Sequence, residues 1–250
     1  MKKLAVLLVA AGFIIPSVYA QEDFTITQKQ KINQIVEKYL QDNPEVIMKS
    51  LIKLRQKTIT KQQEHAKQAV VENSTQILNS KYSPVLGNVK GDITIVEFLD
   101  YRCGHCREMS DVLDTLMQKD KNIKIVIKQL PIFSGDSLTA AKTALAVNKQ
   151  GQFAQIHKQF LSSDALNKDS IDQVLSKNKV NVPLLQTTLK QSWINDEITA
   201  NMKLAKQLGL MGTPAFIIVE SGNAKNNIVL PGTASLEKIK TLVNKVRSAS

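Results

Sequence analysis

The clearest pattern of apolar and polar positions lies between residues 93 and 130. Residues 93–99 and 123–130 are mostly apolar runs, typical of strands buried on both faces. Between them, residues 103–118 predict a helix, because apolar side chains recur at helical spacing at Met109, Val112, Leu113, Leu116 and Met117. A strand, a helix and a strand in this order predict a βαβ unit with parallel strands.

The residues after this unit predict a helical segment followed by a return to strands. Residues 134–209 are helical in pattern, with an alanine-rich stretch at 137–148 and apolar stripes in several later segments. Residues 215–219 and 227–230 are predicted strands, and residues 235–246 a closing helix. The fold class is therefore predicted to be α/β, with a helical subdomain inserted at about 134–209.

Residues 21–80 form a separate region rich in Gln, Lys and Asn. Two short amphipathic helices are predicted, the second restarting at Asn43-Pro44-Glu45, where Asn43 is a suitable cap and Pro44 fits the first turn. A polar helix follows through residues 60–68. Such helices cannot form a core alone, so they are expected to pack on residues 81–250 or on another copy, and self-association is favoured.

The first twenty residues predict a secretory signal peptide. Lys2 and Lys3 precede an apolar run over residues 4–15, and small residues lead up to Ala20, where cleavage is expected. The run is too short to cross a hydrocarbon core of about 30 Å as a helix. The mature protein, residues 21–250, is therefore predicted to be exported and soluble.

The net charge is +11, and it falls to +9 once Lys2 and Lys3 are removed with the signal peptide. The lysines are scattered and aromatic residues make up only 5% of the chain, so nucleic-acid binding is not predicted. A solvated basic surface is the simpler interpretation.

Both cysteines, Cys103 and Cys106, lie in the segment Asp-Tyr-Arg-Cys-Gly-His-Cys-Arg at residues 100–107. A disulfide that closes so short a loop stabilises a fold little. A zinc site needs about four ligands, and His65 and His157 are far away in sequence. Haem attachment needs histidine directly after the second cysteine, but residue 107 is arginine. A redox-active pair is therefore predicted, with no metal and no cofactor.

Cys103 is predicted at the start of a helix. Unpaired N–H groups and the positive end of the helix dipole stabilise a thiolate there, so the pKa of Cys103 is expected to be lowered. His105 can add a hydrogen-bond donor or a positive charge. Cys106 lies one turn further along the helix, so it is expected to be less exposed and to act as the resolving thiol.

The segment Phe98-Leu99-Asp100-Tyr101-Arg102-Cys103-Gly104-His105-Cys106, together with Gly212-Thr213-Pro214 before an apolar strand, resembles the DsbA-like thiol–disulfide oxidoreductases. The resemblance covers about residues 81–250 and implies a thioredoxin fold with a helical insertion. The middle pair, Gly104-His105, is that of eukaryotic protein disulfide isomerase, whereas the best-known DsbA has Pro-His. The helices around Asn43-Pro44-Glu45-Val46 resemble the dimerising extensions of some DsbA-like and ScsC-like proteins.

The resemblance also assigns roles to four further residues. Thr213 and Pro214 correspond to the cis-proline loop, where the Thr213 backbone pairs with a substrate segment as an added strand. Glu97 and Lys128 are charges within buried strands, and in the family a matching acid and lysine help to move protons beneath the active site. Because the strands are adjacent, the two are expected to pair; alternatively both face solvent, or Asp100 takes the acid's role.

The predicted function is that of a periplasmic, homodimeric oxidoreductase that forms and isomerises disulfides in cysteine-containing exported proteins. The resemblance implies a membrane redox partner, either a DsbB-like oxidase or a DsbD-like reductase. The alternative is a copper-binding or chaperone-type thiol protein, because soft thiolates suit Cu(I). No methionine-rich or histidine-rich tract supports that alternative.

Overall fold

The computed structural model describes residues 24–163 and 165–249, and the expected signal peptide lies outside them. The chain divides into two compact units, and the boundary in the sequence lies between Gln56 and Lys57. Among the described residues, none of the helices combines the length and the hydropathy that a membrane span requires.

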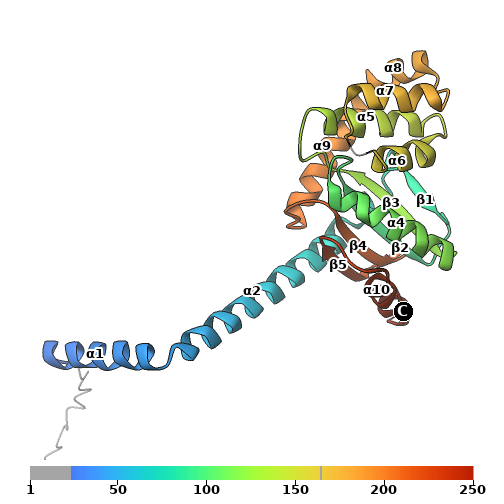
Figure 1. The fold of residues 1–250 in the computed structure, drawn as a ribbon. Helices are drawn as coiled ribbons and strands as arrows, with labels where there is room; N and C mark the ends of the chain where they lie inside the picture. Colours follow the sequence, from blue (N-terminus) through green and yellow to red (C-terminus); the bar gives the residue numbers. More distant parts are fainter. Residues whose placement is uncertain (1–23, 164, 250) are drawn as a thin grey trace, which may run out of the picture. The chain divides into compact units, whose positions relative to one another are not determined.

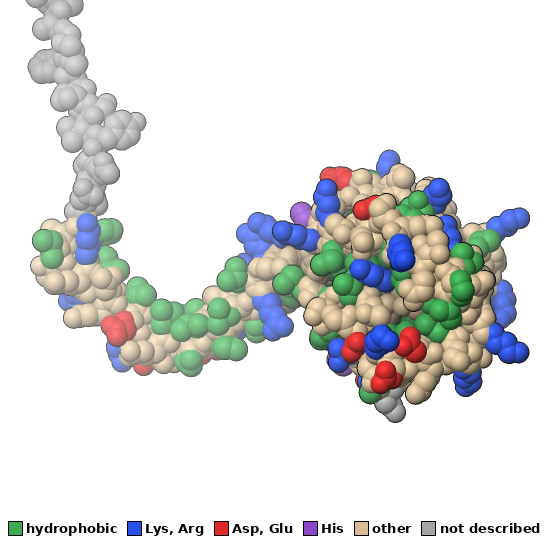
Figure 2. All heavy atoms as spheres, turned by 90° about the horizontal axis from the view of Figure 1, so that it is seen from above, with side chains coloured by type: hydrophobic (Ala, Val, Ile, Leu, Met, Phe, Trp, Pro, Cys, Tyr) green, Lys and Arg blue, Asp and Glu red, His purple; other side chains and the backbone are tan. Residues whose placement is uncertain are grey.

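The first unit holds helix α1 (Ile26–Asp42) and the beginning of α2 (Pro44–Glu72). Thr25 caps α1 by a capping box, in which its hydroxyl accepts from Gln28 N and the Gln28 side chain accepts from Thr25 N. Helix α2 is continuous through the polar stretch at 60–68, which corrects the prediction of a separate helix there. Apolar side chains line the surface of this unit (Figure 2) and are 41–61% exposed: Ile32, Ile35, Val36, Tyr39, Ile47, Leu51 and Leu54.

A five-stranded sheet in the order β1-β3-β2-β4-β5 forms the centre of the second unit (Figure 1). Its strands are β1 (Val85–Gly87), β2 (Ile93–Leu99), β3 (Ile123–Gln129), β4 (Ala215–Glu220) and β5 (Asn223–Pro231). Strands β2 and β3 are parallel and are joined by α4 (Gly104–Lys119), while the other neighbours are antiparallel. The predicted βαβ unit is confirmed.

The helical insertion is also confirmed, since five helices separate β3 from β4 in the chain (Figure 1). They are α5 (Asp136–Asn148), α6 (Phe153–Leu161), α7 (Lys168–Lys177), α8 (Val182–Leu189) and α9 (Ser192–Gln207). Helix α10 (Leu236–Ser248) closes the fold. The architecture is a thioredoxin-like α/β fold with a helical insertion.

The two faces of the sheet belong to different apolar clusters, because successive side chains of a strand point to opposite faces. Ile95 and Leu99 of β2 pack with α4, α10 and the insertion. Val96 and Phe98 pack with the end of α2, α3 (Ser74–Leu78) and the end of α9.

The compact unit that contains the sheet begins at Lys57 and includes the end of α2. Val70 of α2 and Ile77 of α3 are fully buried in the second cluster. Each such side chain contributes about 1.5–3 kcal/mol when it leaves water. On the face shown in Figure 2, lysine and arginine side chains are scattered over this unit.

Candidate redox site

Cys103 lies where β2 ends and α4 begins. It is the N-cap residue of α4, in an extended conformation, and its carbonyl accepts from the N–H groups of Cys106 at 3.1 Å and Arg107 at 3.2 Å. Its side chain therefore lies at the end of the helix where N–H groups lack intrahelical partners and the dipole is positive. Cys103 is 6% exposed and Cys106 is fully buried, so the prediction that Cys106 is the less exposed thiol is confirmed.

The loop before β4 completes the site from a distant part of the sequence. The Thr213–Pro214 peptide bond is cis, as predicted. The Cys103 Sγ donates a hydrogen bond to the Thr213 carbonyl oxygen at 3.2 Å. The fold thus brings together the two motifs on which the resemblance depends.

Glu97 is a buried carboxyl on the same face of the sheet as α4. It is 1% exposed, and among the described residues its Oε1 has no hydrogen-bond partner. Burial raises the pKa of Glu97 to about 8. Burial also raises the pKa of Cys106, and the negative charge of Glu97 raises it further. Glu97 and Cys106 are therefore electrostatically coupled, and both favour the protonated form at neutral pH.

The expected ion pair between Glu97 and Lys128 is wrong. In the register of the parallel strands, Lys128 lies beside Phe98, whereas Glu97 lies beside Ile127. Because paired residues share a face, the side chains of Glu97 and Lys128 point to opposite faces of the sheet. Neither residue faces solvent, so the alternative interpretation of the two charges is wrong as well.

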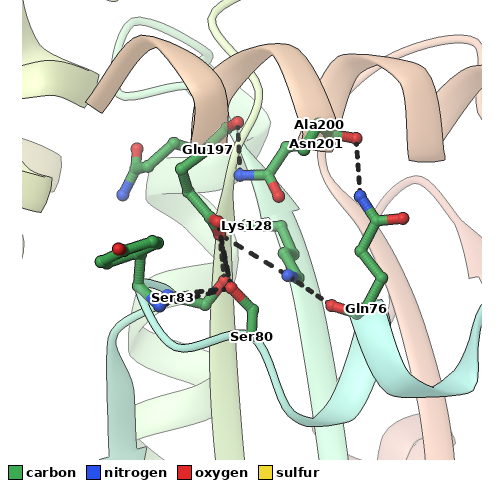
Figure 3. A network of polar contacts seen from close by, with 9 residues as sticks. Gln76, Ser80, Ser83, Lys128, Glu197, Ala200 and Asn201 are labelled. Atoms are coloured by element: carbon green, nitrogen blue, oxygen red, sulfur yellow. Dashed lines mark hydrogen bonds and ion pairs between the residues drawn. The ribbon is translucent and has the colours of Figure 1, made fainter. Parts of the chain in front are cut away.

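Lys128 instead belongs to a polar network beneath α3 and α9 (Figure 3). Its Nζ donates to the Gln76 carbonyl oxygen at 2.8 Å and lies 3.7 Å from Oε1 of Glu197. Burial lowers the pKa of Lys128 to about 8, although the charge of Glu197 opposes this shift. Lys128 therefore acts on the face of the sheet opposite the thiols.

Glu197 is a member of this network that the sequence prediction missed. Its carboxylate accepts hydrogen bonds from the hydroxyls of Ser80 at 2.9 Å and Ser83 at 2.6 Å (Figure 3). The available signal was its position between Ile194 and Ile198 on the buried stripe of α9. A carboxylate on such a stripe needs a partner, and the buried lysine is one.

Asp100 has a different environment from Glu97, because its carboxylate accepts hydrogen bonds from two backbone N–H groups and one hydroxyl. Its Oδ1 accepts from Arg102 N at 2.8 Å and from the Ser137 hydroxyl at 2.7 Å, and its Oδ2 accepts from Phe133 N at 3.2 Å. These bonds fix the turn before Cys103 against the start of α5. Both carboxylate oxygens of Asp100 thus have hydrogen-bond partners, whereas Oε1 of Glu97 has none among the described residues.

The sequence also offers Gly104 and the three histidines as candidate site residues or metal ligands. Gly104 is the first residue of α4, and a Cβ there would meet only the Arg107 side chain, at 3.8 Å. His105 is exposed, with Nδ1 3.1 Å from Glu108 Oε2. His65 is exposed on α2.

His157 belongs to the core. It is buried, its Nδ1 lies 3.0 Å from the Tyr101 hydroxyl, and burial lowers its pKa to about 4. His157 is therefore a neutral packing residue at physiological pH.

Comparison with known proteins agrees with this geometry. Residues 94–244 match the family model of the DSBA-like thioredoxin domain, which is more than half of the chain. A thiol:disulfide interchange protein DsbA from Burkholderia cepacia is 26% identical over 158 residues, which are 58% of this chain and 73% of that protein.

Solved structures resemble the chain over different lengths. A thioredoxin-like oxidoreductase from Silicibacter pomeroyi is 28% identical with a TM-score of 0.65, and the match covers 71% of this chain and 99% of that one. BcfH from Salmonella enterica Typhimurium is 22% identical with a TM-score of 0.76, covering 89% of this chain and 97% of that one. The chain therefore belongs to the DSBA-like thioredoxin-domain family and is a thiol–disulfide oxidoreductase.

Proposed function

We propose that Cys103 and Cys106 form the redox centre, and that the oxidised pair transfers its disulfide to cysteine-containing exported proteins. The observation that carries this proposal is the contact of the Cys103 thiol with the Thr213 carbonyl at the N-terminus of α4. A sulfur at this place has helix N–H groups on one side. On the other side lies a backbone segment that can align a client chain.

In the proposed oxidation, a client thiolate attacks the Cys103 sulfur, and the bond between Cys103 and Cys106 breaks. Cys106 leaves as a thiolate and takes up one proton. A second client thiolate then attacks the client sulfur of the mixed disulfide, and Cys103 leaves as a thiolate at the N-terminus of α4. Two electrons have moved from the client to the enzyme, one proton is on Cys106, and the other client proton has gone to solvent.

Glu97 is the proposed proton source for Cys106. The carboxyl is protonated below about pH 8, and burial makes the anionic form of Cys106 unfavourable. A proton passed from Glu97 therefore stabilises the departing thiol. His105, exposed on the first turn of α4 two residues from Cys103, is proposed to donate a hydrogen bond to the Cys103 sulfur during the exchange.

The proposed setting is the periplasm, where a membrane oxidase resembling DsbB would remove two electrons from the reduced pair. A reductase resembling DsbD would instead keep the pair reduced for isomerisation. We further propose that the exposed apolar stripe of residues 24–56 joins two copies. Two redox centres in one assembly can hold a misfolded chain while its disulfides exchange.

The test of the proposed function is oxidation of a reduced, unfolded client protein by stoichiometric oxidised enzyme, followed by counting the client thiols that remain. The wild type should remove two thiols per enzyme chain. Cys103→Ala should remove none, and Asp169→Asn, an exposed change in α7, should match the wild type. Equal thiol loss with wild type and Cys103→Ala would reject the proposed centre.

A further inference from the structure

A second feature adjoins the cis-proline loop, a mostly apolar groove of about 700 Å³. Three segments line it: α2, the loop that precedes the cis-proline, and the end of β5. We call it the α2 groove and define it by Ile59, Ala66, Leu210, Met211, Val229 and Pro231. All of these residues lie in the second unit of the chain.

Two segments that line the α2 groove lead directly to the cis-proline loop. Met211 precedes Thr213 by two residues, so their Cα atoms are at most about 8 Å apart. Pro231 pairs with Ala215 in the sheet, and Gly232 N donates to the Pro214 carbonyl at 2.9 Å. Two of the three walls therefore end at the cis-proline loop, whose Thr213 carbonyl touches the Cys103 thiol.

The groove has apolar side chains that the fold leaves uncovered in the single chain. Met211 is 99% exposed and Ile59 is 43% exposed, whereas Ala66 at the floor is buried. Covering a large, fully exposed apolar side chain two residues before Thr213 with a second apolar surface is favourable.

We propose that the α2 groove binds an extended apolar segment of the client chain next to the client's reactive cysteine. This inference rests on the proposed function, because attack on Cys103 places the client backbone beside Thr213. An extended chain advances about 3.3 Å per residue, so side chains two or three residues from the client cysteine reach Met211. The groove thus selects clients by the residues that flank the cysteine.

Part of this surface comes from outside the matched family domain. Ile59 and Ala66 precede residue 94, where the match to the family model begins. The end of α2 is held in place by Val70 in the core and by Asn227, whose Nδ2 donates to the Lys67 carbonyl at 3.3 Å. The helical extension therefore contributes to client recognition by its own redox domain.

The charges of the groove refine the class of client segment. Lys61 and His65 line it, and no acidic residue does so within the described part of the chain. An apolar segment with an acidic residue is therefore favoured over one with a basic residue. This preference should weaken as salt is added, because the Lys61 ammonium is exposed to solvent.

The experiment uses the full mature chain and two peptides with a reduced cysteine pair, one with apolar and acidic flanks and the other with Gly-Ser flanks. The measured quantity is the ratio of the two oxidation rate constants. Met211→Gln and Ile59→Gln should each lower this ratio roughly fivefold, the loss of about one apolar contact. Met202→Gln, a matched change at an exposed methionine of α9, should keep the wild-type ratio.

A binding measurement separates this inference from the proposed function. The apolar and acidic peptide, with serine in place of cysteine, is titrated into the Cys103→Ala protein and followed by fluorescence anisotropy. Met211→Gln in that background should raise the Kd roughly fivefold. If the Kd is the same with and without Met211→Gln, the proposed binding site is wrong. It is also wrong if the groove variants change the sedimentation of the protein but neither the Kd nor the rate ratio. Failure to oxidise either reduced peptide would instead count against the proposed function, and the anisotropy result would still decide the groove.

Discussion

Glu97 and Lys128 lie on neighbouring strands, but their side chains point to opposite faces of the sheet. Glu97 faces the helix that carries the thiols, and Lys128 faces α3 and α9. The two buried ionisable groups therefore have separate surroundings, and substitutions can address them independently. Their shifted pKa values affect stability in different ranges of pH.

Replacing Glu97 by Gln should make the protein more stable in mildly alkaline solution. The pKa of Glu97 is raised from 4.5 to about 8 in the folded protein, so the unfolded chain loses this proton first as pH rises. The free energy of unfolding of the wild type should therefore fall between these two pKa values, by about 1.4 kcal/mol for each step of one in pH. Urea unfolding at pH 5 and pH 8 measures the effect.

The neutral amide of Glu97→Gln removes this dependence, so the variant should gain on the wild type as pH rises from 5 to 8. Glu220→Gln, at a partly exposed end of β4, is the control and should keep the wild-type slope. If Glu97→Gln and the wild type have parallel profiles, Glu97 is ionised in the folded state and cannot be the proton source for Cys106.

Replacing Glu197 by Gln should destabilise the protein by about 3 kcal/mol at pH 7, because it leaves a buried lysine without its counter-charge. Glu237→Gln breaks an exposed pair with Lys240 and should cost less than about 1 kcal/mol. The double change of Lys128 to Met and Glu197 to Leu should recover much of the loss. Chemical denaturation provides all three values.

The lysine also predicts a dependence on pH with the opposite sign to that of Glu97. The pKa of Lys128 is lowered from 10.5 to about 8, so the unfolded chain binds this proton first as pH falls. Its contribution to the free energy of unfolding should rise between about pH 8 and 10.5. In the Lys128→Met variant this rise should be missing; an unchanged alkaline profile would contradict the assignment.

The Cys106→Ala variant should accumulate mixed disulfides with client proteins, since the thiol that can release Cys103 from a trapped client is gone. Non-reducing electrophoresis followed by mass spectrometry of the trapped species measures this. Cys103→Ala is the matched control and should form no such adducts, because Cys106 is fully buried. Similar adducts with both variants would mean that clients attack either sulfur.

Deleting residues 24–56 from the mature chain should abolish self-association but keep the fold and client oxidation. These residues carry the exposed apolar stripe and lie outside the unit that contains the sheet. Sedimentation velocity measures the assembly, and reactivation of a scrambled client measures isomerisation, which should be lost. If the truncated and the full-length protein contain the same number of chains per particle, the dimer proposal fails.

A longer deletion, through residue 80, should unfold the second unit. It removes Val70 and Ile77 from the core and the Gln76 carbonyl from Lys128. Circular dichroism distinguishes this outcome from simple loss of assembly.

The sequence predicted the elements whose patterns are local. The period of the apolar residues gave the βαβ unit, and the spacing of Cys103 and Cys106 at a helix start gave the candidate site. The cis bond before Pro214 followed from the resemblance. These features need no knowledge of how distant segments pack.

The partners of buried charges could not be predicted in the same way. A shift of one residue in register between β2 and β3 would have placed Lys128 beside Glu97, because faces alternate with every residue. Glu197 is 69 positions from Lys128, and only the packing of α9 on the sheet brings them together. The α2 groove likewise depends on α2 packing near β5, which no periodicity reveals.

The burial of Lys128 beneath α3 determines where a foreign N-terminal segment can be joined to this chain without loss of the fold. A chimaera that joins a foreign N-terminal segment at residue 57 keeps Gln76 and Glu197, the two partners of the Lys128 ammonium, with the sheet. It also keeps Ser80 and Ser83, whose hydroxyls bind the Glu197 carboxylate. A junction placed at residue 94, where the matched domain begins, would remove the Gln76 carbonyl from Lys128 and would expose the apolar face that Val70 and Ile77 bury. Residues before Lys57 can therefore be replaced without loss of these contacts, whereas residues 57–93 have to stay with the sheet.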